Sequence, residues 1–402
     1  MSTDVLVLNT AAVDFRSSEF EFAEKMVGSG GLTKWKTEDM PDYTQQQLNQ
    51  FIQNGQAVAG GSGNTAPLMA RTGLKVAVGA NLGSGDFDGL DAHGRFFYDV
   101  MAANNVDVSQ FYIHPKLPTG CTFIYDKKGD ERGGLAFFPN ANNDFDFERF
   151  KGSVEKLNPK IVYYIYSGLS DRGDANGGKD LAEFIKWCRS KGSVTIVDSH
   201  TYAGEPQKLA EKGTAVKEYK LLEPLLGQVD LFFTSSDEAK MIENTIGTPK
   251  AWKGLDEDGF HKHFLGFLAE KFWTENGSSR MFGVTVSNGA YEKHCATDGN
   301  ISEVKKIESR FMAGEVIDLV GAGDSFRAGF LSYVANNVEK FKNGELNFDE
   351  AVSMGNLFAA LYIKAPLDDR YGNIRPYENM LKSVTSKVNY RSFSDLLEQV
   401  NS

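Results

Sequence analysis

Short apolar runs that alternate with longer amphipathic stretches are the feature that most limits the possible folds of this chain. Stretches of helical periodicity, the first ending near Arg189, separate the runs in the second half of the sequence. These runs are Ile161–Tyr166, Val194–Val197, Leu231–Phe233 and Phe282–Val286. Strands that alternate with helices usually form a parallel sheet covered on both faces. The sequence therefore predicts an α/β fold with a mostly parallel central sheet.

Two segments interrupt this alternation. Residues 15–58 are rich in glycine and glutamine and suggest a partly irregular excursion. A β-hairpin is expected later, with strands at Cys121–Tyr125 and Leu135–Phe138 and a turn at Lys127–Asp130. The 402 residues show no fixed repeat, so we expect one large domain that carries β-rich insertions.

Charge and composition exclude several partners. The net charge of −11, without any run of lysine and arginine, argues against binding to nucleic acid or to an anionic membrane. A single nucleotide remains possible, because a local group of N–H donors and a metal ion suffices to hold its phosphates. The three cysteines lack a paired spacing, and no signal peptide or membrane-spanning run is evident, so a cytoplasmic enzyme is the simplest interpretation.

Residues 318–326 form the segment with the clearest chemistry. An apolar run with Val316 and Ile317 precedes glycines, and helical periodicity follows from Ser325 to Asn336, which together predict a strand, a glycine turn and a helix. The free N–H groups at such a helix start favour a phosphate, and Asp324 could accept a proton from an attacking hydroxyl. The alternative is an ordinary helix entry in which Asp324 is only an N-cap.

Residues 60–66 form a second glycine-rich segment. Its glycines allow a ligand to approach the backbone, and Asn64 offers a donor and an acceptor to hydroxyl groups. A flexible turn capped by Asn64 is the alternative. Asp14, which closes the first predicted strand Val5–Leu8 after a short turn, is expected to bind substrate hydroxyls or to cap that turn. Arg327 receives no role.

Together these segments resemble the ribokinase-like, or PfkB, family of carbohydrate and nucleoside kinases. The resemblance rests on Asp14, on Gly60–Gly61 with Asn64 and Ala66, on Gly89–Gly94 with Asp91 and Arg95–Phe96, and on Asp318–Asp324. It implies a three-layer α/β/α fold with a small β-sheet lid, built as one domain over residues 1–402. The lid insertions are expected at about 15–58 and 113–138.

The resemblance also implies roles for individual residues. Asp324 would be the base, and the backbone of Gly321, Ala322 and Gly323 would stabilise charge on the transferred phosphoryl group. The expected substrate-binding residues are Asp14, Gly60, Gly61 and Asn64, and the expected nucleotide-binding residues are Ser287, Gly289 and Asn356.

The same resemblance implies the cofactors and the ions that the site would bind. ATP and Mg²⁺ would be the cofactors, with Glu238 contacting the magnesium ion through water. Ser235 stands where the family has an asparagine, and Leu319 stands where it has a threonine. A monovalent cation such as K⁺ is allowed near Asp318.

The implied activity is transfer of the γ-phosphoryl group of ATP to a primary hydroxyl of a sugar or sugar-like alcohol. One alternative is a nucleoside kinase, because Gly28–Leu32 and Tyr163–Leu169 are somewhat like adenosine kinases, with Phe123 or Phe137 as the slot for a base. A non-catalytic protein that senses sugars or nucleotides is the alternative of another class. The lid strands could also pair between two subunits as a homodimer.

Overall fold

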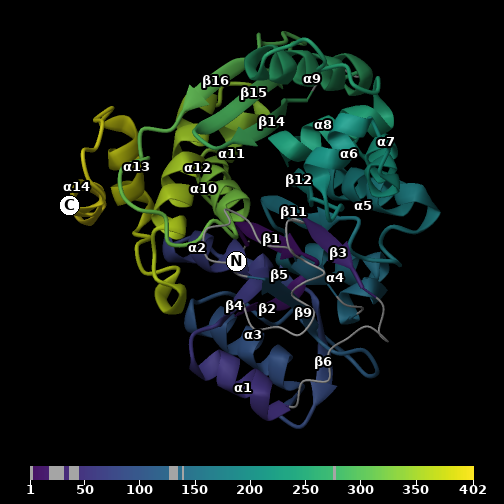
Figure 1. Cartoon of the computed structure of the whole chain (residues 1–402), viewed down its shortest axis with the longest axis vertical. Helices are drawn as coiled ribbons and strands as arrows, with labels where there is room; N and C mark the ends of the chain where they lie inside the picture. The colour runs from purple at the N-terminus through teal and green to yellow at the C-terminus, as the bar shows by residue number, and fades with distance from the viewer. Residues whose placement is uncertain (1–2, 18–30, 36–44, 126–134, 138–139, 275–277) are drawn as a thin grey trace.

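A large sheet lies at the centre of the computed structural model, which describes residues 3–17, 31–35, 45–125, 135–137, 140–274 and 278–402 (Figure 1). In spatial order, its eight strands in the described chain are β16 (Lys305–Glu308), β15 (Gly289–Cys295), β14 (Arg280–Val286), β13 (Leu231–Ser235), β12 (Val194–Ser199), β11 (Ile161–Ser167), β1 (Val5–Leu8) and β5 (Val76–Gly79). The neighbouring strands β14, β13, β12, β11, β1 and β5 are parallel to one another. Strands β15 and β16 are antiparallel to their neighbours. The predicted mostly parallel α/β sheet is therefore confirmed.

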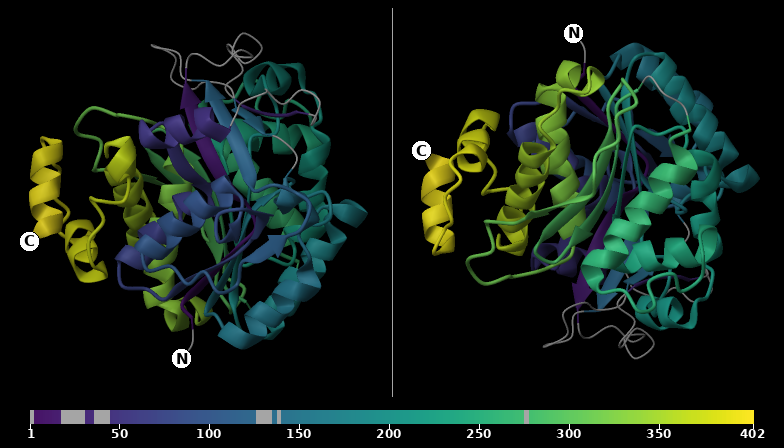
Figure 2. Two further views of the ribbon diagram at one scale, coloured as in Figure 1. Left: turned by 90° about the horizontal axis from the view of Figure 1, so that it is seen from below. Right: turned by 90° about the horizontal axis from the view of Figure 1, so that it is seen from above.

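The two faces of this sheet are covered by two separate hydrophobic clusters, which gives three layers (Figure 2). Along β1, Val5 and Val7 belong to one cluster and Leu6 and Leu8 to the other, because successive side chains of a strand point to opposite faces. The helices that contribute to the first cluster are α2 (Ala66–Arg71), α3 (Ala92–Ala103), α10 (Ala322–Asn336), α11 (Val338–Lys342), α12 (Phe348–Ile363), α13 (Tyr377–Thr385) and α14 (Phe393–Asn401). Those of the second are α4 (Phe147–Leu157), α5 (Lys179–Ser190), α6 (Pro206–Lys212), α7 (Leu222–Leu225), α8 (Ser236–Ile246) and α9 (Glu257–Phe272).

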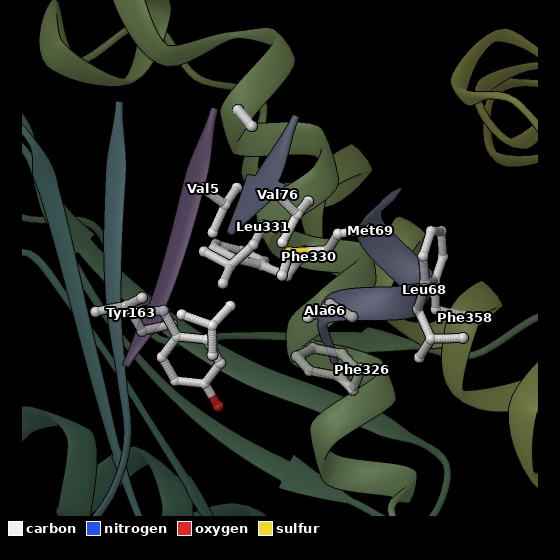
Figure 3. Packing of buried hydrophobic residues seen from close by; sticks show 14 of the residues in the cluster. Val5, Ala66, Leu68, Met69, Val76, Tyr163, Phe326, Phe330, Leu331 and Phe358 are labelled. Atoms are coloured by element: carbon white, nitrogen blue, oxygen red, sulfur yellow. The ribbon is translucent and has the colours of Figure 1, made fainter. Parts of the chain in front are cut away.

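Helix α10 is buried from Asp324 to Ala335 and is held against the sheet by aromatic residues. Figure 3 shows Phe330 and Leu331 of this helix beside Val5 of the large sheet, and Phe326 beside Ala66 of α2. The ring of Phe330 lies 4.8 Å from that of Phe233 on β13, measured between centroids. Full burial of a large apolar side chain stabilises a fold by roughly 1.5–3 kcal/mol, so this packing fixes where α10 begins.

A second sheet packs beside the first and draws its strands from both insertion segments. In spatial order, the strands are β3 (Leu32–Lys34), β10 (Leu135–Phe137), β9 (Gly120–Tyr125), β2 (Ala11–Ser17) and β4 (Ala57–Gly61). Helix α1 (Gln45–Gln53) contributes Leu48 to its core. Strands β9 and β10 are antiparallel, which confirms the predicted hairpin, although its turn at Lys127–Asp130 lies outside the described residues. A three-stranded sheet of β7 (Gly89–Leu90), β6 (Asn81–Gly85) and β8 (Tyr112–His114) completes the described strands.

Two local predictions are wrong. The apolar run before the glycine turn is not a strand, and the side chains of Val316 and Ile317 are 41% and 55% exposed. Asp14 does not close the first strand either. The chain leaves β1 at Asn9 and Thr10, whose φ angles of 75° and 36° are positive, and enters β2, so that Asp14 lies inside the second sheet.

Candidate active site

Two cavities meet where helix α10 begins. The larger has a volume of about 860 Å³ and is here called the large cleft. The smaller, of about 320 Å³, is called the small cavity and lies between the second sheet and the large sheet. The two cavities share six of their lining residues, which are Ser235, Thr285, Ser287, Leu319, Ala322 and Gly323. A group bound in the large cleft can therefore reach the small cavity at the start of α10.

The start of α10 offers backbone donors at this junction. Gly321 is the N-cap residue, and no side chain caps the helix. Its φ of 86° favours glycine, and a Cβ atom there would lie 2.8 Å from Cε1 of Tyr362. The first N–H groups of a helix favour an anion where they lack partners. Here the Ala322 N–H donates to the Leu319 carbonyl at 3.1 Å, so the donors considered at this turn are those of Gly321 and Gly323. The turn Gly321–Gly323 can thus bind an anionic group that spans the two cavities.

Asp324 follows this turn and lies in the small cavity, with only 5% of its surface exposed. Its Oδ2 atom accepts hydrogen bonds from Asn64 Nδ2 at 3.1 Å and from the Tyr166 hydroxyl at 2.6 Å. Burial, and after it the charge of Asp324, raises the pKa of Tyr166 well above its ordinary value. The phenol therefore stays protonated and donates, which orients the carboxylate.

Arg327 lies one turn further along α10 and is also buried. Its Nη1 atom is 3.5 Å from Oδ1 of Asp324, and its Nε atom is 3.1 Å from Oδ2 of Asp198. Asp198 in turn accepts hydrogen bonds from the Tyr163 hydroxyl and from the Tyr166 N–H. This network holds Arg327 beside the carboxylate of Asp324.

The residues expected to bind substrate surround the same cavity. Asp14, Gly61 and Asn64 line it. Gly60 lies directly against the Asp14 carboxyl, because a Cβ atom at this position would come within 2.4 Å of it. Asn64 accepts a hydrogen bond from the Tyr362 hydroxyl at 2.7 Å while it donates to Asp324. Its amide is therefore oriented by two partners.

The residues expected at the nucleotide lie elsewhere. Ser287, Gly289 and Asn356 all line the large cleft, and Ser287 also reaches the small cavity. The exposed residues Val316 and Leu319 form part of the same wall. Val316, from the apolar run that resembles a strand in the sequence, therefore lines the large cleft.

Glu238 lies in the small cavity and is saturated by hydrogen bonds. It accepts from Thr234 Oγ1 at 2.8 Å, from Thr201 Oγ1 at 3.0 Å and from the Ser235 N–H at 3.0 Å. The Ser235 side chain accepts from the Glu238 N–H in return, which makes a capping box at the start of α8. Magnesium in proteins usually keeps several waters, so this carboxylate fits contact through water better than direct coordination.

The surroundings of Asp318 do not fit a monovalent cation. The guanidinium of Arg16 contacts the Asp318 carboxylate, and Nη2 of Arg370 is 3.3 Å from Oδ2. Two positive groups at this carboxylate would repel a further cation. The expectation of K⁺ at Asp318 is therefore not supported.

Sequence patterns missed four residues of this region, namely Arg16, Tyr166, Tyr362 and Arg370. Each contacts a residue far away in the chain; the hydrogen bond from Tyr166 to Asp324, for example, joins positions 158 apart. An arginine inside the apolar strand β2 was the one available signal, because buried charges are usually paired.

Comparisons with known proteins point to one family and one fold. The model for the pfkB family carbohydrate kinase matches residues 36–255 and 287–369. A comparison with curated proteins finds no match. No helix in the described part of the chain is long and apolar enough to cross a membrane.

Three solved structures illustrate the shared fold. Adenosine kinase from Anopheles gambiae is 17% identical, with a TM-score of 0.65 over 92% of this chain and 98% of that one. Fructokinase from Xylella fastidiosa, solved with ATP, is 16% identical, with a TM-score of 0.63 over 96% and 99%. An E. coli protein in complex with ATP and Mg²⁺ is 15% identical, with a TM-score of 0.59 over 96% and 100%.

At such identities these structures show the ribokinase-like fold, and the family match over most of the sequence shows the relationship. The chain is an enzyme that belongs to the pfkB family of carbohydrate kinases.

Proposed function

We propose that this enzyme transfers the γ-phosphoryl group of Mg-ATP to a primary hydroxyl of a sugar or sugar-like alcohol. One observation carries the proposal. Ala322 and Gly323 line both the large cleft and the small cavity, and the buried carboxylate of Asp324 follows them in the small cavity. Donors for a phosphoryl group and a base for a hydroxyl thus stand side by side.

In this proposal ATP occupies the large cleft. The apolar side chains of Val316, Leu319 and Ile363 would contact the adenine, and the γ-phosphate would lie at the turn Gly321–Gly323. The related fructokinase was solved with bound ATP, which supports the same use of this fold.

The acceptor would occupy the small cavity, with hydroxyl groups bound by Asp14 and Asn64. As the acceptor oxygen forms its bond to the γ-phosphorus, the bond to the β-phosphate oxygen breaks and ADP leaves. Asp324 takes the proton of the attacking hydroxyl. The N–H groups of Gly321 and Gly323 would stabilise the negative charge on the phosphoryl oxygens during transfer.

Magnesium would neutralise part of the phosphate charge. Glu238, with the hydroxyl groups that donate to it, would hold a water of that ion near the shared wall of the two cavities. The related E. coli structure contains both ATP and Mg²⁺, which supports this cofactor pair.

A nucleoside is the second candidate acceptor, and the lining of the small cavity favours it. Leu32, Leu135, Phe137 and Leu169 give this cavity an apolar side opposite its polar residues. A flat apolar slot suits the base of a nucleoside, whereas a sugar alone would leave it in contact with water.

An acceptor panel tests the proposal. Purified protein with Mg-ATP would be incubated with pentoses, hexoses, ketoacid sugars and nucleosides, and ADP and the phosphorylated product would be quantified. Transfer to a sugar supports the first candidate, and transfer to nucleosides alone supports the second. Binding of ATP and of panel members without any transfer would contradict both and indicate a sensing protein.

A further inference from the structure

The carboxylate of Asp318 lies between two buried arginines that come from opposite ends of the chain. The side chains of Arg16 and Arg370 are 7% and 2% exposed, and that of Asp318 is 15% exposed. Nη2 of Arg370 also donates a hydrogen bond to the Val320 carbonyl at 2.9 Å. Neither arginine lines the large cleft or the small cavity.

The two arginine side chains place positive charge at oxygen atoms that could otherwise bind an alkali cation. Carboxylate and carbonyl oxygens are the ligands that hard cations prefer. Here Oδ2 of Asp318 and the carbonyl of Val320 already face the guanidinium of Arg370. An arginine cannot lose its charge in a protein, so the positive charge is permanent.

The oxygens that the arginines bind belong to the segment that leads into the anion-binding turn. Oδ1 of Asp318 accepts a hydrogen bond from the Val320 N–H at 2.9 Å, and Gly321 follows directly. The Arg370 guanidinium also lies 4.0 Å from the centre of the Tyr362 ring. Because Tyr362 donates to Asn64 and Asn64 donates to Asp324, contacts continue from Arg370 to the proposed base.

The location of the two arginines in the chain adds an independent argument. Both lie outside residues 36–255 and 287–369, which the family model matches. Arg16 belongs to β2 of the second sheet, two residues after Asp14, so its ion pair joins that sheet to the anion-binding turn. The ion pairs therefore join Asp318, inside the matched region, to Arg16 and to Arg370, the residue directly after that region.

We propose that Arg16 and Arg370 are positioning residues that hold the turn Gly321–Gly323 in place of a monovalent cation, so that this enzyme does not need K⁺. The inference rests on the proposed function, because it takes this turn as the site of the γ-phosphate. An ATP analogue and ADP differ by the third phosphate. The ratio of their affinities therefore reports on binding at that site.

The first experiment uses the natural sequence. The affinities of the non-hydrolysable analogue AMP-PNP and of ADP are measured with Mg²⁺ by calorimetry, in KCl and in tetramethylammonium chloride at equal ionic strength. We expect the preference for AMP-PNP over ADP, and the melting temperature, to be the same in both salts within about twofold and about 1 °C. A tenfold stronger preference, or a clearly higher melting temperature, in KCl would overturn the proposal.

The second experiment compares Arg370→Met with Arg375→Met. Arg375 lies five residues further on, contacts Asn401 and the Gly372 carbonyl, and touches neither Asp318 nor the turn. Arg370→Met should lower the preference for AMP-PNP by about tenfold, the value of one charge-assisted hydrogen bond, and Arg370→Lys should recover part of it. Arg375→Met should leave the preference unchanged.

Equal preferences in Arg370→Met and Arg375→Met would contradict the proposal. If Arg370→Met does not fold, Arg370→Lys and the comparison of salts decide the question. If the natural protein binds neither nucleotide, the proposed function fails, and the melting temperatures in the two salts still test whether the arginines replace a cation.

Discussion

Two buried carboxyl groups, Asp14 and Asp324, face the small cavity from different surroundings. Asp324 accepts hydrogen bonds from Asn64 and Tyr166 and has a guanidinium nearby, and these groups orient its carboxylate. Burial raises the pKa of Asp14 from 3.8 to about 6, although the charge of Arg16 opposes this shift. The two groups are therefore suited to different tasks, with Asp14 binding hydroxyls and Asp324 accepting a proton.

The raised pKa of Asp14 predicts an acid limit on acceptor binding. The ionised carboxylate accepts hydrogen bonds from hydroxyls better than the protonated acid does. Below pH 6 the kcat/KM for the acceptor should fall by about tenfold per pH unit, with the loss in KM. Steady-state kinetics with the acceptor found in the panel, from pH 5 to 8, measure this.

Unfolding would not explain that loss. Because the folded pKa of Asp14 lies above its ordinary value, the protonated form favours the folded state, and this group adds stability as pH falls from about 6 toward 4. Asp14→Asn should therefore lower acceptor affinity at pH 8 and remove the fall below pH 6. A parallel pH profile in Asp14→Asn would contradict the role of Asp14.

At the scale of an element, the start of α10 depends on a glycine with a left-handed backbone. Gly321→Ala would add backbone strain of roughly 1–3 kcal/mol and push the new Cβ atom into Tyr362. A shift of the turn by a fraction of an ångström should lower kcat by about 10-fold to 100-fold. Steady-state kinetics and denaturant unfolding of the variant measure both effects.

Gly254→Ala is the matched control. Gly254 has a φ of 91°, similar to the 86° of Gly321, but a Cβ atom there would meet nothing within 4 Å. Gly254→Ala should therefore lose comparable stability and keep its kcat. Similar turnover in the two variants would show that the turn tolerates displacement, against the proposed anion site.

Elements whose signals are local could be predicted from the sequence. The parallel strands of the large sheet, the hairpin of β9 and β10 and helix α10 follow from periodicity over neighbouring residues, whereas β15 and β16 were not predicted. The run with Val316 and Ile317 was misread as a strand because exposed apolar residues, such as Val316 in the wall of the large cleft, and a buried strand have the same composition. The switch of sheets at Asn9 and Thr10 depends on two positive φ angles that residue types alone do not indicate.

At the scale of the whole molecule, the small cavity lies between the two sheets, and we expect the second sheet to close over a bound acceptor. Binding of acceptor together with AMP-PNP should draw the second sheet onto the first and slow amide exchange in β2 and β9 by roughly tenfold. Hydrogen exchange followed by mass spectrometry measures this. Strand β5, which lines neither cavity, should be unchanged. Unchanged exchange in β2 and β9 would contradict a closing lid.

The contacts between distant segments of the site could not be predicted from the sequence. The motifs at Asp14, Gly60–Asn64 and Asp318–Asp324 are short, and the structure brings them together across some 300 residues. The ion pairs of Arg16 and Arg370 with Asp318 depend on packing between distant segments. No local pattern encodes such contacts, so the two arginines beside Asp318 became evident only in the structure.

The most direct test of the account is the turnover of Asp324→Asn beside its affinity for ATP. Asparagine keeps the shape of the side chain but cannot take the hydroxyl proton. We predict that kcat for the preferred acceptor falls by about 10²–10⁴ while the affinity for ATP changes by less than about twofold. Near-normal turnover in Asp324→Asn would contradict the assignment of Asp324 as the base.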